Sequence, residues 1–84
     1  MIVKVQHFKD NVIGVWEEEI YSNVEKVFRF RDVNNDEFLN LKIKNQEVLE
    51  LIPVTYIDEN GNHPSLVGAI WLMNDEGKTI EKLV

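Results

Sequence analysis

With 84 residues, 44% of them hydrophobic, the chain fits one small globular domain, 1–84, and its composition argues against disorder. A net charge of −6 argues against non-specific binding to nucleic acid or anionic membranes, and no apolar run is long enough to span a bilayer. The absence of cysteine excludes a disulfide framework and thiolate chemistry, and it favours a reducing, cytoplasmic setting.

The first two segments of the chain differ in how clearly they predict a structure. Residues 2–8 alternate β-branched and polar residues and predict a strand, which ends at the break formed by residues 9–11. Residues 12–27 are ambiguous. Apolar residues at Trp16, Ile20, Val24 and Val27 have helical spacing, and Glu17–Glu19 would complement the dipole of a helix start. Many of the remaining residues are poor helix formers, so a strand is an equal alternative.

Residues 24–44 predict a β-hairpin. If Asn34-Asn35 forms a two-residue turn, residues whose numbers sum to 69 lie opposite each other. Phe28 and Phe30 then face Leu41 and Leu39 on a mostly apolar face. The other face would collect an aromatic ring and four cations, namely Arg29, Arg31, Phe38, Lys42 and Lys44.

A second hairpin is expected around Asn60-Gly61, because both residues tolerate the left-handed region. It would pair residues 48–57 with residues 64–73. This hairpin is apolar on both faces, so a helix within 12–27 would cover one of them. If 12–27 is instead a strand, one face stays exposed as a partner or self-association surface, with residues Ile52, Val54, Val67, Trp71 and Met73.

A turn at residues 75–77 precedes a last strand over residues 78–84. These elements predict a mainly β fold, or an α+β fold if one helix lies within 12–27. The architecture expected is a small antiparallel sheet or barrel of about five to seven strands, built from consecutive hairpins.

Catalytic and metal-binding patterns are weak. Neither serine lies in a nucleophile elbow, and Ser65 is too close in sequence to His63 for a productive nucleophile–base pair. Residues 32–36 begin like a calcium loop, but Glu37 stands where the sharp turn needs glycine. We therefore expect no enzyme, no cofactor and no metal site. Glu50 or His63 would be the centre of an enzyme, as the least favoured alternative.

The leading functional hypothesis is a non-catalytic protein-binding module that acts as an inhibitor or regulator by surface complementarity. Its expected contact residues are aromatic and apolar anchors with one acidic run, namely Trp71, Met73, Ile52, Val54, Trp16, Glu17, Glu18 and Glu19. The partner would be a protein, with a nucleic-acid-binding enzyme as one class, and a homo-oligomer is a further alternative. No membrane and no nucleic acid is involved in this hypothesis.

The alternative hypothesis is a small β domain that binds nucleic acid. It would use the cationic face of the 24–44 hairpin, where Arg29, Arg31, Lys42 and Lys44 surround Phe38. Cations interleaved with an aromatic ring are typical of single-strand binding platforms. The acidic net charge opposes this hypothesis.

In general character, the chain resembles the small inhibitory and accessory proteins of phages and mobile elements, of which the acidic uracil-DNA glycosylase inhibitors are one group. The resemblance rests on size, on acidity and on a closing hairpin over residues 71–84. It implies an accessory protein of inhibitor type. No site residue is carried over from it, and the Arg/Lys face interrupts the continuous acidic strip that a DNA mimic would present.

Overall fold

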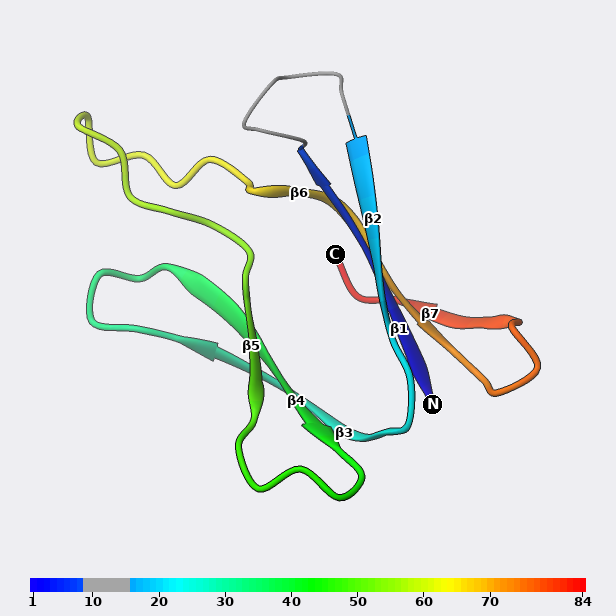
Figure 1. Ribbon diagram of the computed structural model, residues 1–84. Coiled ribbons are helices and arrows are strands. Elements are labelled where there is room, and N and C mark those ends of the chain that lie inside the picture. The colour runs from blue at the N-terminus through cyan, green and yellow to red at the C-terminus, as the bar shows by residue number, and fades with distance from the viewer. Residues whose placement is uncertain (9–15) are drawn as a thin grey trace. The chain divides into compact units, whose positions relative to one another are not determined.

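The computed structural model describes residues 1–8 and 16–84 and confirms the mainly β fold. The described part of the chain contains no helix, and hence none that could span a membrane. Its strands are β1 (Ile2–Phe8), β2 (Trp16–Tyr21), β3 (Val24–Arg31), β4 (Glu37–Ile43), β5 (Glu50–Pro53), β6 (Val67–Met73) and β7 (Thr79–Lys82) (Figure 1). They form two sheets, with strand orders β2-β1-β6-β7 and β3-β4-β5.

The chain divides into two compact units. Unit 1 comprises residues 1–24 and 67–84 and carries the four-stranded sheet. Unit 2 comprises residues 25–66 and carries the three-stranded sheet. Unit 2 is thus inserted, along the chain, between the two parts of unit 1.

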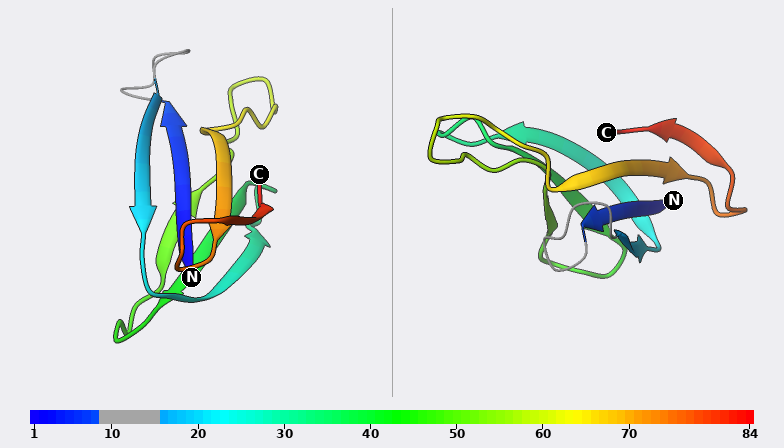
Figure 2. Two further views of the ribbon diagram at one scale, coloured as in Figure 1. Left: turned by 90° about the vertical axis from the view of Figure 1, so that its right-hand side faces the viewer. Right: turned by 90° about the horizontal axis from the view of Figure 1, so that it is seen from above.

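The sheet of unit 1 has β1 between β2 and β6 (Figure 2), and both pairings are antiparallel. The predicted first strand is therefore confirmed. Val3 and Val5 lie on one face with Ile70 of β6, and all three are fully buried. Their β-branched side chains suit a pleated, buried surface.

The strand alternative is confirmed for the part of residues 12–27 that the structure describes. Residues 16–21 pair along β1, with Ile20 opposite Lys4 and Trp16 opposite Phe8, so the helix alternative is wrong there. Residues 9–15, which include the expected break at 9–11, lie outside the described residues. Pairing with a neighbouring strand has overridden the helical spacing, which is a weak local preference.

The β3–β4 hairpin is confirmed, but its register differs from the predicted one by one residue. The amide of Asp32 donates to the carbonyl of Asp36 at 3.0 Å, and the amide of Asn35 donates to the carbonyl of Asp32 at 3.0 Å. Only Asn35 of the two turn asparagines has a positive φ, 66°. The loop therefore contains three residues instead of two. Near the loop, the numbers of two opposed residues sum to 68 instead of 69.

The one-residue difference in register places Phe28 and Phe30 on the face of the sheet opposite to Leu39 and Leu41. Phe30 lies beside Phe38, and their rings stack with centroids 5.1 Å apart. Leu39 and Leu41 point the opposite way and are fully buried. The predicted apolar face that joined Phe28 and Phe30 to these leucines is therefore wrong, because side chains alternate strictly along a strand.

The predicted pairing of residues 48–57 with 64–73 is also wrong. β5 pairs with β4 instead, with Ile52 opposite Leu39, and β6 pairs with β1 and β7. Near the expected turn, only an isolated bridge joins Thr55 and Ser65. The turn itself is present, since Gly61 has a φ of 78° and its amide donates to the carbonyl of Asp58. The last strand after the turn at 75–77 is confirmed as β7.

Three loops repeat one hydrogen-bonding pattern, and they span residues 32–36, 58–62 and 74–78. In each, Oδ1 of the first residue accepts from the backbone amides of the third and fifth residues at 2.9–3.0 Å. The fourth residue, Asn35, Gly61 or Gly77, has a positive φ. An Asx side chain that satisfies the turn amides and a residue that tolerates the left-handed region together fix this loop type.

Substitution of Asn35 tests this loop. We expect Asn35→Ala to lower the free energy of unfolding by about 1–2 kcal/mol, because a left-handed backbone conformation costs more free energy for alanine than for asparagine. Asn35→Gly should leave stability within ~0.5 kcal/mol of the parent. Urea unfolding followed by circular dichroism measures both, and equal stabilities of the two variants would contradict the assignment of a left-handed residue.

Candidate protein-binding surface

The predicted partner-binding residues lie in both units. Trp16, Glu17–Glu19, Trp71 and Met73 belong to the four-stranded sheet of unit 1. Ile52 and Val54 belong to unit 2 and are only 1% and 2% exposed. Their expected exposure is wrong, as is that of Val67, because all three side chains are core residues. Buried aliphatic side chains cannot contact a partner without unfolding.

Strand register places four of the six remaining predicted residues on one face of the sheet of unit 1, namely Trp16, Glu18, Trp71 and Met73. Trp16 lies opposite Phe8 and Glu18 opposite Gln6, while Trp71 and Met73 lie opposite Lys4 and Ile2. Directly opposed residues of antiparallel strands share a face. We call this surface the aromatic face, and its members are Lys4, Phe8, Trp16, Glu18, Ile20, Trp71 and Met73.

Trp16 is held flat on the sheet. Its ring stacks on that of Phe8, with centroids 4.3 Å apart and an interplanar angle of 24°. A Cβ atom at Gly68 would lie 2.4 Å from Cζ3 of the same ring, so the indole covers the glycine backbone. Because Gly68 has no side chain, the ring can approach this closely. The outer side of Trp16 remains exposed to solvent.

Trp71 and Glu18 are joined through Lys4. The ammonium of Lys4 lies 4.8 Å from the Trp71 ring centroid and 3.8 Å from Oε1 of Glu18. These contacts are partly solvated, so each contributes little to stability. They do restrict the side chains that a partner would meet, which lowers the entropy lost on binding.

The acidic run does not form one strip, because alternation divides it. Glu18 lies on the aromatic face, whereas Glu17 and Glu19 lie on the face that carries Val5. Glu19 contacts Nε2 of His7 at 2.9 Å and accepts a hydrogen bond from the Tyr21 hydroxyl. The three carboxylates are all exposed, but they point to two sides of an edge strand.

The residues of the nucleic-acid hypothesis do not share a face. Phe38 and Lys42 lie on the side of β4 that meets Phe30, whereas Arg29 and Arg31 alternate with Phe30 and point the other way. Arg29 approaches Oε1 of Glu37 at 3.9 Å, and Arg31 donates to the carbonyl of Asn35 at 3.3 Å. Lys44 lies beyond the end of β4. The predicted cationic platform depended on the two-residue turn, and the three-residue loop divides it.

His63 and Glu50, the centres considered for an enzyme, lie at different places along β4 in unit 2: His63 contacts Asp36, just before β4, and Glu50 lies opposite Leu41. Nδ1 of His63 lies 2.8 Å from Oδ1 of the buried Asp36, which also accepts from the hydroxyl of Thr55 at 3.4 Å. The Thr55 hydroxyl accepts from the amide of Glu37 at 2.8 Å. This network joins the segment after the 58–62 loop to the start of β4, so a structural role accounts for His63.

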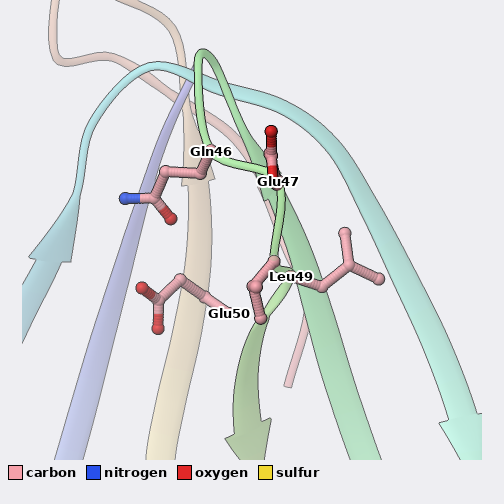
Figure 3. A pocket seen from close by; sticks show the side chains of 5 residues that line it. Gln46, Glu47, Leu49 and Glu50 are labelled. Carbon is pink, nitrogen blue, oxygen red and sulfur yellow. The ribbon is translucent and has the colours of Figure 1, made fainter.

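Glu50 lines an open hollow of about 430 Å³ with its neighbours in residues 46–50 (Figure 3). Figure 3 shows the Gln46 amide and the Glu50 carboxylate on the same side of this segment. Small-molecule sites usually enclose most of their ligand, and this hollow does not. Among the described residues, no group of three or more His, Cys, Asp or Glu side chains could hold a metal ion.

A second surface was missed by the sequence analysis. It is the side of the three-stranded sheet opposite Leu39 and Leu41, and we call it the apolar face. Its members are Phe28, Phe30, Phe38, Leu51 and Pro53. The repeated Asx loops were the signal that could have revealed it, because three copies of one loop type indicate three-residue connections and hence the correct register.

Comparison of the chain with protein-family models, with curated proteins and with solved structures finds no match in any of the three.

Proposed function

We propose that this protein is a non-catalytic protein-binding module that acts as an inhibitor or regulator by surface complementarity, in the cytoplasm. The observation that carries the proposal is the aromatic face, where both tryptophans of the chain lie with Met73 on one side of a single sheet. Tryptophan is enriched among the residues that dominate interface energy. Indole rings also offer a large contact area with few rotatable bonds.

The chemistry of the aromatic face suggests the partner surface. Exposed Ile20 and Trp16 would fill apolar depressions, while Lys4 and Glu18 already neutralise each other and need no charged counterpart. A mainly apolar protein surface with a polar rim fits this pattern. Nucleic acid is less supported, because the arginines and lysines of unit 2 point to different sides.

Substitutions on the aromatic face test the proposal. Immobilised protein should capture one partner stoichiometrically from an extract of the source cell, and quantitative mass spectrometry identifies it. Ile20→Asp and Trp71→Ala should each weaken the purified complex at least tenfold, because truncated hot-spot residues commonly cost ~2 kcal/mol or more. Ile20 is exposed, so its variant should keep the parent circular dichroism spectrum.

Ile57→Asp is the matched control, because it introduces the same charge at an exposed isoleucine in unit 2. We expect this variant to bind like the parent. Equal binding by Ile20→Asp, or equal loss by Ile57→Asp, would contradict the assignment of the aromatic face.

The nucleic-acid alternative has its own measurement. Fluorescence anisotropy with single-stranded oligonucleotides at 50 mM and 200 mM salt, roughly the range in which phosphate contacts lose most affinity, should show no binding. Binding that falls steeply between the two conditions would favour the alternative over the proposal.

A further inference from the structure

The apolar face of unit 2 is a contiguous surface on a different sheet from the aromatic face. Phe28, Phe30 and Leu51 are 44%, 39% and 52% exposed. Phe38 lies opposite Pro53 and its ring stacks on Phe30, so apolar side chains adjoin across all three strands in that row. In the next row the polar Asn40 lies opposite Leu51. Single exposed hydrophobic residues are normal, whereas contiguous ones mark interaction sites.

The core does not require this face to be apolar. The opposite side of the same sheet supplies the buried residues Leu39, Leu41 and Ile52. A sheet with one buried face usually alternates apolar and polar residues, which keeps the second face soluble. Here β3 and β5 place large apolar residues at the alternating solvent-side positions as well. Burial in the core of this sheet therefore does not account for these apolar residues.

The charges on this side of the three strands are all positive and lie at one end. Lys26 precedes Phe28 by two residues, and Lys42 follows Phe38 by four, so both share the side of the apolar face. The Lys42 ammonium donates to the carbonyls of Ile43 and Gln46, which fixes it at the end away from the 32–36 loop. The chain as a whole has 15 acidic and 9 basic residues, so this end departs from its average charge.

The size of the apolar face favours a short segment over a second copy of the chain. With roughly half of each large side chain exposed, the face offers on the order of 400 Å². A stable protein–protein complex buries about 800 Å² on each partner. A homodimer built on this face alone would therefore be weak, whereas a segment of six to ten residues (roughly, from that area) covers it completely.

We propose that the apolar face binds a short segment of a partner protein that carries adjacent aromatic or aliphatic side chains and carboxylates at one end. The apolar side chains of the segment cover Phe28, Phe30 and Leu51. Its carboxylates lie beside Lys26 and Lys42 at the end away from the 32–36 loop. Charge at that end sets the direction in which the segment lies on the sheet.

Selection from a displayed library of random 12-residue peptides, with the full chain as bait, tests this proposal. We expect enriched peptides to combine at least two large apolar residues with Asp or Glu near one end. Their affinity, measured by fluorescence anisotropy, should fall at least tenfold in Leu51→Asp and in Lys26→Glu, and it should fall with added salt. Both side chains are exposed, so circular dichroism should show an unchanged fold.

Ile20→Asp provides the control, because it changes the aromatic face and leaves the apolar face intact. It should bind the peptides like the parent. The proposal is overturned if no peptide is enriched, if enriched peptides lack acidic residues, or if Leu51→Asp binds them normally. It is overturned equally if light scattering shows a dimer that Leu51→Asp dissociates, or if oligonucleotides bind and Phe30→Ala abolishes that binding.

Discussion

Leu41→Ala should lower the free energy of unfolding by about 2–5 kcal/mol, the range for leucine truncations that leave a cavity in a packed core. Leu41 is fully buried on β4, the central strand of the three-stranded sheet. A domain of this size has little stability to lose. We therefore expect a large fraction of the variant to be unfolded at room temperature in urea titrations followed by circular dichroism.

Leu51→Ala is the matched control, since it makes the same truncation in the neighbouring strand. Leu51 is half exposed on the other side of the sheet, so its loss should cost below about 1 kcal/mol. A cost equal to that of Leu41→Ala would show that Leu51 is packed in the folded protein. That outcome would also remove the apolar face as a free binding surface.

Gly68→Ala should have the second largest effect, about 1–3 kcal/mol of destabilisation, as for an inserted methyl group in a packed site. The new Cβ would lie 2.4 Å from the Trp16 ring, far inside contact distance. The ring cannot simply swing away, because it stacks on Phe8. We expect a shift in tryptophan emission together with a lower midpoint of urea unfolding.

A double-mutant cycle separates this steric effect from a general effect of alanine. In a Trp16→Ala background, Gly68→Ala should cost less than half as much, because the obstructing ring is gone. Gly61→Ala should cost about 1 kcal/mol in both backgrounds, since its penalty comes from a φ of 78° and not from a neighbour. Additive costs for Gly68→Ala and Trp16→Ala would contradict the close packing.

Local features of the chain were predictable from its sequence. The strand over residues 2–8 follows from its β-branched residues and from the alternation of Val3 and Val5 with polar residues, which favours a half-buried strand. The chain reversals at Asn34-Asn35, Asn60-Gly61 and residues 75–77 follow from residues that tolerate a positive φ. Both kinds of signal depend on neighbours in the sequence, so no tertiary information was needed to read them.

The register of the β3–β4 hairpin was not predictable from the Asn34-Asn35 turn alone. Asn34-Asn35 reads as a two-residue turn, but Asp32 accepts the amides of Asn34 and Asp36 and closes a three-residue loop. That single additional residue exchanges the two faces of the hairpin. Because of this difference in register, the apolar face stands where the sequence predicted a cationic platform. The error in register therefore affected the candidate site more than the fold.

Strand partners distant in sequence were not predictable either. Residues 67–73 are apolar on both sides, which is consistent with any interior strand. The Asn60-Gly61 turn favoured β5 as the partner, yet β6 pairs with β1, with Met73 opposite Ile2. The tryptophans were singled out by residue type, and their contact with a partner stays a prediction. Their common face with Lys4 depends on that distant pairing, and the sequence contains no local signal for it.

The insertion of unit 2 within unit 1 affects how the chain can fold during its synthesis. β1 and β2 leave the ribosome early, but β6, which covers the other edge of β1, begins only at Val67. An isolated two-stranded hairpin is marginally stable, so the free edge of β1 stays open to pairing with other nascent chains until that strand arrives. Unit 2 is continuous and closed by local loops, so we expect it to fold first. Slower translation of residues 25–66 should therefore raise the fraction of newly made chains that aggregate.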